Sequence, residues 1–125
     1  MPGVVVAGGI IQCSHGGQLK LSSGRSELEV GGAQAIVSGL EVGLSFKSGA
    51  PGVTVPCLMT TPPPASTLSP CTATLAAIAG VSTLLTIAGA GVLLDDANGP
   101  ATNGADLTAT WRVASAGQTL LSVDR

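Results

Sequence analysis

The stretch IIQCSHGGQLKL, residues 10–21, contains two short, mainly apolar runs that are separated by Ser-His-Gly-Gly. A glycine pair between such runs favours a tight turn, because glycine adopts left-handed backbone conformations that other residues avoid. The stretch therefore predicts two short β-strands, IIQC and QLKL, joined by a turn. It also places Cys13 two residues before His15, the only histidine of the chain.

The same organisation extends along the chain in both directions. At residues 27–30, two glutamates alternate with Leu28 and Val30, which is the period-two pattern of a strand with one face in water, and a glycine pair follows. Residues 106–113 alternate in the same way, with one face made of Leu107, Ala109, Trp111 and Val113. Further short strands are predicted at residues 4–7, 33–39, 52–55, 82–89, 91–96 and 118–124.

The composition indicates an all-β fold. The chain has 18 glycines and 8 prolines among many Val, Leu, Ile, Ala and Thr residues, and it lacks long runs of strong helix formers. Its 125 residues suffice for one domain, so we expect a single domain over residues 1–125. Short strands separated by glycine-rich turns fit a sandwich, a small barrel and a β-solenoid equally well.

Charged and aromatic side chains are too few for several kinds of binding protein. Five Lys and Arg residues stand singly against seven Asp and Glu residues, so the net charge is −2 and no basic patch suits nucleic-acid phosphates. One Phe, one Trp and no Tyr provide no platform on which bases could stack. We therefore expect no nucleic-acid partner.

Two apolar segments bear on the relation of the chain to membranes. Residues 1–13 lack the positively charged leading region of a secretory signal, so we expect no export signal. Residues 74–94 form an uncharged run about as long as the roughly 20 residues of a membrane-spanning helix. A small membrane-inserting protein that uses residues 75–94 is therefore the alternative function. Several glycines and the lack of flanking basic or aromatic residues favour buried strands and no stable membrane span.

The three cysteines and the histidine point to a metal site. Residues two apart on a strand project to the same side, so Cys13 and His15 would present a sulfur and a nitrogen side by side. Cys57 and Cys71 each follow a proline, which restricts the local backbone. Three thiols and one imidazole make the Cys₃His ligand set of a structural zinc site. An odd number of cysteines also fits a simple disulfide framework poorly.

Two other interpretations of these residues stay open. In one, the cysteines are buried apolar side chains and His15 is a surface turn residue. In the other, Cys13 and His15 are a catalytic pair, although such a pair needs a cleft and a third orienting group. Asp95 and Asp96 precede an Asn-Gly pair and are interpreted as part of a solvated turn. No phosphate-binding or dinucleotide-binding glycine motif is present, and we expect no enzymatic activity.

Four segments together resemble the PAAR-like spike-tip proteins of contractile injection systems, which include phage tails, type VI secretion systems and extracellular devices. In that family a Cys-x-His-Gly-Gly element, a Pro-Cys pair and a late strand ending in VLL recur in this order. The segments here are GGIIQCSHGGQLKL (8–21), LEVGG (28–32), PGVTVPC (51–57) and LLTIAGAGVLLDDANG (84–99). The resemblance covers roughly residues 3–96, and the Pro-Ala-Ala-Arg tetrapeptide of the family name is absent.

The resemblance implies a small conical β-structure whose wide base sits on a trimeric β-helical spike protein at the baseplate, with one tip per trimer. Such a tip caps and sharpens the spike and helps it to puncture the target envelope. Toxin cargo is a further partner that the resemblance allows. The tip would assemble in the cytoplasm and then travel with the injection particle, outside the cell or into the target cell.

The resemblance also implies one structural metal ion near the apex, zinc in preference to iron, with the ligands Cys13, His15, Cys57 and Cys71. The narrow end of a cone is too thin to enclose an apolar core, and a structural metal contributes on the order of 10 kcal/mol there. At the other end, an interface that is permanently covered resembles a domain core cut in half. We therefore expect part of residues 74–94 to lie at or near the base that meets the spike.

Overall fold

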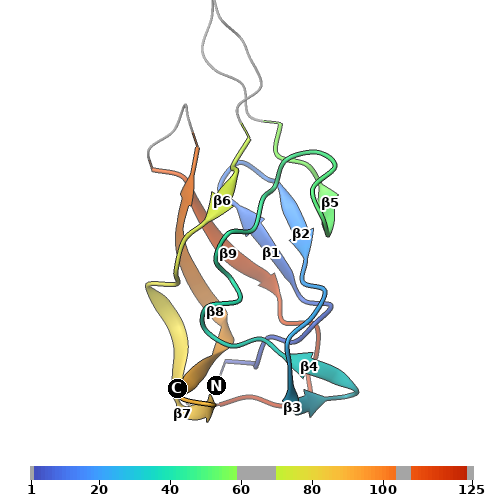
Figure 1. The fold of residues 1–125 in the computed structure, drawn as a ribbon, viewed down its shortest axis with the longest axis vertical. Coiled ribbons are helices and arrows are strands. Elements are labelled where there is room, and N and C mark those ends of the chain that lie inside the picture. The colour runs from blue at the N-terminus through green and yellow to red at the C-terminus, as the bar shows by residue number, and fades with distance from the viewer. Residues whose placement is uncertain (1, 59–69, 104–107, 124–125) are drawn as a thin grey trace, which may run out of the picture.

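The computed structural model describes residues 2–58, 70–103 and 108–123. Within these ranges the chain forms β-strands and no helix, which confirms the all-β prediction (Figure 1). The strands are β1 (Ile10–Cys13), β2 (Gln18–Lys20), β3 (Arg25–Val30), β4 (Ala33–Ala35), β5 (Val53–Val55), β6 (Ala73–Thr74), β7 (Ala79–Ile87), β8 (Ala90–Thr102) and β9 (Thr110–Ser115).

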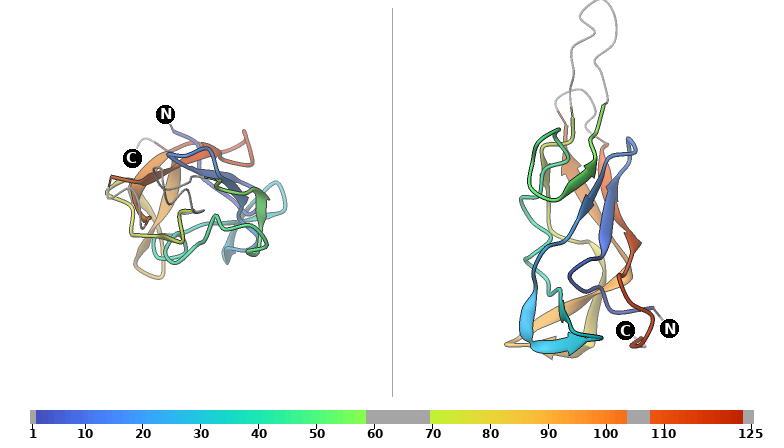
Figure 2. Two further views of the ribbon diagram at one scale, coloured as in Figure 1. Left: turned by 90° about the horizontal axis from the view of Figure 1, so that it is seen from above. Right: turned by 90° about the vertical axis from the view of Figure 1, so that its right-hand side faces the viewer.

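Seven of these strands form one antiparallel sheet that curls around the core, as the view from above in Figure 2 shows. The strand order is β5-β2-β1-β9-β8-β6, and β7 pairs with β8 beside this path. The strands β1 and β2 are the two that the sequence predicts around Ser-His-Gly-Gly, and they pair from Ile10↔Lys20 to Gln12↔Gln18. The remaining two strands, β3 and β4, form a separate hairpin.

The uncharged run at residues 74–94 lies mostly in strands. A tight turn joins β7 to β8 at Ala88 and Gly89, whose φ angles of 52° and 85° are left-handed. This part of the fold thus consists of strands and not of a helix at residues 75–94. The expected burial holds for Val92, Leu93 and Leu94 on β8, whereas β7 has four exposed residues, Leu84 among them. In the described part of the chain, no helix is long and apolar enough to span a membrane.

The turn predicted beside Asp95 and Asp96 is wrong, because both residues and the Asn98-Gly99 pair lie within the 13-residue strand β8. Gly99 is paired with Trp111 on β9. A β-carbon at residue 99 would come within 2.8 Å of the indole nitrogen. The glycine therefore serves the close packing of the indole against β8, and not a reversal of the chain.

Two clusters of buried side chains fill the fold. The larger cluster surrounds Trp111 and Phe46 and includes all three cysteines. The smaller cluster is aliphatic and includes Val4 and Leu94. The alternation predicted for residues 106–113 is confirmed where the structure describes it, because Ala109, Trp111 and Val113 are buried while the residues between them are exposed. Leu107 lies outside the described residues.

Two other predicted strands are less regular than expected. Residues 4–7 form two isolated bridges, Val4 with Leu94 and Val6 with Ala35, and not one continuous ladder. The strand predicted at residues 33–39 ends at Ala35, because the chain then leaves β3. The Ile36 N–H donates to the Val5 carbonyl at 2.9 Å, and Val37 forms a bridge with Val92 on β8.

The strand predicted at residues 118–124 is wrong in its described part. The Gln118 side chain donates from Nε2 to the carbonyl groups of Val4 and Leu121, at 2.7 and 2.8 Å. Its Oε1 accepts from the backbone N–H groups of Leu120 and Leu121, at 2.6 and 2.8 Å. The backbone bends around this side chain. Residues 121–123 then form only one isolated bridge, Ser122 with Gly3, and no continuous ladder.

The molecule is elongated, and its two ends differ. The β3–β4 hairpin and the β7–β8 turn lie at the same end as the marked termini, in the lower part of Figure 1 and of the right-hand view in Figure 2. The strands β5 and β6 lie toward the opposite end. Cys57 follows β5 and Cys71 precedes β6. The stiff loop predicted between these cysteines falls largely outside the described residues.

Candidate metal centre

Cys13 ends β1, and the turn after it shapes the candidate site. The Cys13 N–H donates to the Gly17 carbonyl at 2.9 Å, and the Gly16 N–H donates to the Cys13 carbonyl at 3.1 Å. The Gly17 N–H also donates to the Cys13 sulfur, at 3.2 Å, in a buried position. The predicted turn therefore does more than reverse the chain, because it aims a backbone donor at the thiol.

Cys57 and Cys71 reach the same place from β5 and β6, and Phe46 links their backbones. The Cys57 N–H donates to the Phe46 carbonyl at 2.9 Å, and the Phe46 N–H donates to the Cys71 carbonyl at 3.0 Å. Phe46 is fully buried in the larger cluster. On the other side, Pro56 ends β5 because proline has no N–H for the ladder. The chain then turns inward at residue 57.

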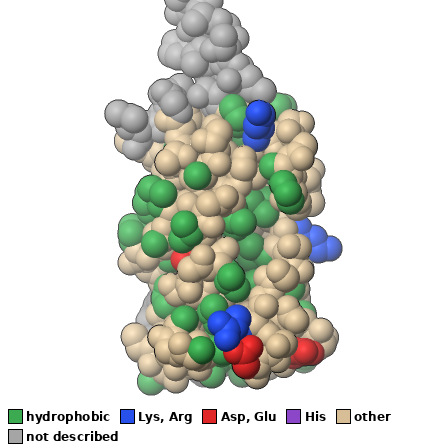
Figure 3. Space-filling view, viewed as in Figure 1, with side chains coloured by type: hydrophobic (Ala, Val, Ile, Leu, Met, Phe, Trp, Pro, Cys, Tyr) green, Lys and Arg blue, Asp and Glu red, His purple; other side chains and the backbone are tan. Residues whose placement is uncertain are grey.

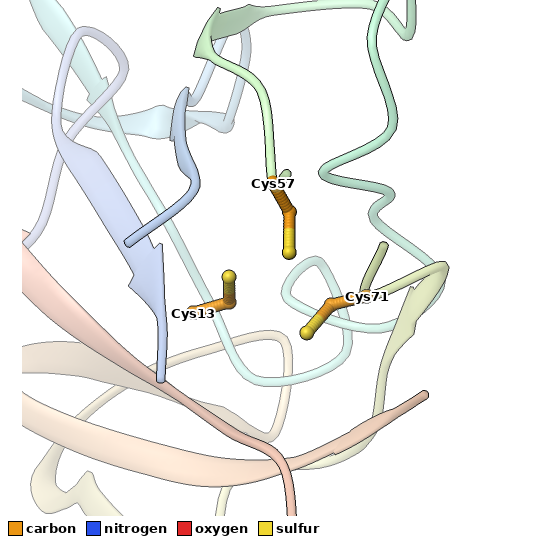
Figure 4. A group of neighbouring side chains, drawn as sticks. All are labelled: Cys13, Cys57 and Cys71. Carbon is orange, nitrogen blue, oxygen red and sulfur yellow. The ribbon is translucent and has the colours of Figure 1, made fainter. Parts of the chain in front are cut away.

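The three sulfur atoms lie within 4.8 Å of one another. Figure 4 shows the three side chains pointing toward a common centre from three separate segments. All three residues are at most 2% exposed, and none of the three forms a disulfide. In a tetrahedral zinc site, Zn–S bonds of about 2.3 Å place neighbouring sulfurs about 3.8 Å apart. The spacing of Cys13, Cys57 and Cys71 therefore suits a single metal ion.

His15 lies beside this group and outside it. Its Nδ1 atom is 3.7 Å from the Cys71 sulfur, close to the separation of about 3.6 Å expected between nitrogen and sulfur ligands of one zinc ion. The group whose ligand atoms all lie within 4.8 Å of one another nevertheless consists of the cysteines alone. Of the four predicted ligands, the structure thus brings three together and places the partly exposed histidine at their edge.

The pKa values of two of the thiols, Cys13 and Cys71, lie above the ordinary value of a cysteine. Burial raises the pKa of Cys13, while the backbone N–H groups of His15 and Gly17 act in the opposite direction. Burial also raises the pKa of Cys71 from 9.0 to about 12, against the effect of a hydrogen bond from Asn103. These two thiols are therefore protonated at neutral pH. Because an incoming metal ion must displace the protons, metal affinity should increase as the pH rises.

Burial alone does not distinguish a metal site from apolar packing, since all three cysteines belong to the larger hydrophobic cluster. Their arrangement favours a metal site. Apolar packing does not require thiols from distant segments to face one another, and it does not require hydrogen-bond donors at sulfur. Here the Gly17 N–H and the Asn103 amide point at the sulfurs of Cys13 and Cys71. Such donors around the ligands are typical of metal centres.

Gly17 and Asn103 are the two site residues that the sequence analysis did not identify. A signal for Gly17 existed in the His-Gly-Gly motif, although it indicated only a turn. A β-carbon at residue 17 would lie 2.9 Å from Cβ of Cys57 and 3.0 Å from the Cys13 sulfur. No local signal marks Asn103, which is 32 residues from Cys71 in the chain.

We expect the substitution Gly17→Ala to weaken metal binding at least about tenfold and to cost about 1–3 kcal/mol of stability. The added methyl group must push Cys57 away from Cys13 and so separate the sulfurs. Zinc affinity, measured by competition with a chromophoric chelator, and urea denaturation would test this. The matched control is Gly16→Ala, whose β-carbon meets no atom within 4 Å although φ is +86°. Equal zinc affinities of the two variants would contradict the expectation.

The chain matches no family model, no curated protein and no solved structure. Its functional assignment therefore rests on its own residues and on the geometry of the cysteine group.

Proposed function

We propose that this chain is a small β-protein stapled by one structural metal ion, and more specifically that it is the tip of the spike of a contractile injection system. The observation that carries the proposal is the convergence of three buried thiols from three distant segments. The resemblance of the segments around these cysteines to PAAR-like spike tips supplies the specific function.

The metal contributes a cross-link and no chemistry in this proposal. Cys13, Cys57 and Cys71 would hold the ion, and His15 would complete a Cys₃His set after a small shift of its ring. Thiolate and imidazole ligands suit zinc and iron, and a tetrahedral structural site is typical of zinc. One ion there would tie the end of β1 directly to the segments that follow β5 and precede β6, which are not neighbours of β1 in the sheet.

The end away from the cysteines is the proposed base. It contains the β7–β8 turn, and thus part of the uncharged run at residues 74–94 (Figure 1). Leu84 on β7 is 70% exposed, and Leu120 is 76% exposed. Leucines that are this exposed suit a surface that a partner covers. Figure 3 draws the side of the molecule, where hydrophobic side chains are spread over the face and several of the few charged side chains lie toward the lower end.

Co-expression with the trimeric β-helical spike protein of an injection system tests the proposed function. We expect one chain per spike trimer after affinity purification and size-exclusion chromatography. The substitution Leu84→Lys should abolish the complex, since it places a charge in the proposed base. Leu58→Lys is the matched control, because Leu58 is 65% exposed but follows Cys57 at the other end.

Elemental analysis of the purified, reduced chain provides the second measurement. One zinc ion per chain is expected. A chain that binds no metal, or that fails to bind a spike trimer when Leu84 is intact, would contradict the proposal. If Leu58→Lys abolished the complex and Leu84→Lys did not, the spike would bind at the cysteine end, and the proposed position of the base would be wrong.

A further inference from the structure

Asn103 lies directly after β8 and is buried beside Cys71. Its side chain is 6% exposed, and its Nδ2 atom is 3.7 Å from the Cys71 sulfur. The pairing of β6 with β8 produces this contact. Ala73 pairs with Thr102, and the Thr72 N–H donates to the Thr102 carbonyl at 3.0 Å, so residue 103 arrives next to residue 71. Since an amide nitrogen is a donor only, the sulfur is the acceptor.

We propose that Asn103 is a positioning residue of the metal centre, which holds the Cys71 thiolate toward the ion and thereby sets the affinity of the site. The inference rests on the metal centre of the proposed function. A hydrogen bond to a charged acceptor is stronger than a bond to the same group when neutral. The amide therefore favours the metal-bound thiolate over the free thiol.

The donors at Cys13 and Cys71 differ in kind. The donor to Cys13 is the backbone N–H of Gly17, at 3.2 Å, which no substitution removes without changing the turn. The donor to Cys71 is a side chain, so it can be changed while the backbone stays as it is. Three thiolates and a divalent ion also leave a net negative charge in a buried place, which an amide dipole offsets and a carboxylate would increase.

The test compares zinc affinity in four variants of the full chain. Asn103→Asp keeps the shape, removes the donor and adds charge, so we expect zinc binding to weaken by about 10- to 100-fold. Asn103→Ala should weaken it less, and Asn103→Gln, which keeps an amide, should restore part of the loss. Asn98→Asp is the matched control: Asn98 lies on β8 and its Nδ2 donates to the Asp96 carbonyl at 3.2 Å. It should bind zinc as the unmodified chain does.

Cobalt(II) in place of zinc provides a signature that a merely structural role would not move. A hydrogen bond to a thiolate lowers the energy of the sulfur lone pair, so its loss should shift the sulfur-to-cobalt charge-transfer band to longer wavelength. Asn103→Ala and Asn103→Asp should show this shift at full cobalt occupancy, whereas Asn103→Gln should not. A general loss of folding would reduce the intensity of the band and leave its position unchanged.

Unchanged zinc affinity and band position in Asn103→Ala and Asn103→Asp would overturn the inference while leaving the metal centre intact. If Asn103→Asp lacks the native far-UV spectrum, the comparison of Asn103→Ala with Asn103→Gln decides the question by the same two readouts. If the unmodified chain takes up neither zinc nor cobalt, the proposed metal centre fails, and the inference fails with it. The unmodified chain thus tests the centre, and the variants test Asn103.

Discussion

Removal of the proposed metal ion from the purified, reduced protein is expected to lower the midpoint of thermal unfolding by about 30 °C or more. Structural zinc contributes roughly 10 kcal/mol or more of folding free energy in small sites. In a chain of 125 residues, each kcal/mol corresponds to several degrees. The measurement is calorimetry with and without a strong chelator, followed by readdition of zinc to restore the midpoint.

The substitution Cys13→Ser separates metal loss from nonspecific effects of the chelator. This variant should melt near the midpoint of the stripped protein, minus the cost of a buried hydroxyl, and the chelator should change it no further. If the cysteines were only apolar side chains, the chelator would leave the unmodified protein unchanged. An equal midpoint with and without chelator would therefore refute the metal centre.

The substitution Trp111→Ala is expected to destabilise the protein by about 3–5 kcal/mol, the usual cost of removing a large buried aromatic side chain. Trp111 is 1% exposed, faces Gly99 across β8 and β9, and pairs with Cys13 on its other side. Its Nε1 donates to the Leu75 carbonyl at 2.9 Å. The loss should therefore loosen the sheet beside the thiols as well as the core.

Urea denaturation followed by far-UV circular dichroism measures this effect, because Trp111 is the only tryptophan and its fluorescence disappears with it. Trp111→Phe keeps most of the apolar volume and should isolate the cost of leaving the Leu75 carbonyl without this donor, about 1–3 kcal/mol. Leu120→Ala is the control, since Leu120 is 76% exposed and should change stability by less than about 0.5 kcal/mol. A loss below about 1 kcal/mol for Trp111→Ala would contradict the core described above.

Strands whose signal is local were predicted well. β1 and β2 flank a glycine turn, and β9 alternates apolar and polar residues, so neighbours in the chain suffice to define them. The error at residues 118–124 has the opposite origin. There an apolar run resembles a strand, but the side chain of Gln118 bonds to the backbone of Leu120 and Leu121 and bends the chain, so that only the isolated bridge of Ser122 with Gly3 remains. The pattern of apolar residues in the sequence gives no sign of these side-chain hydrogen bonds.

The candidate site was likewise predicted only in part: the sequence identified its ligand residues but not their arrangement. Residue chemistry alone marked Cys13, Cys57 and Cys71 as a possible ligand set, because soft donors are so few in this chain. Their convergence depends on how β1, β5 and β6 are placed around Phe46, and the register of β6 on β8 brings Asn103 to Cys71. The position of His15 at the edge of the group also follows from that placement.

The order of residues thus decided where the chain extends, where it turns and which side chains can bind a soft metal, since propensity, alternation and ligand chemistry are properties of a few neighbouring residues. Only the tertiary structure decided that the three cysteine sulfurs lie together, that His15 lies at the edge of this group and that the amide of Asn103 lies beside Cys71. Those outcomes depend on pairing between strands that are far apart in the chain, where a shift of one residue exchanges the buried and exposed faces of a strand.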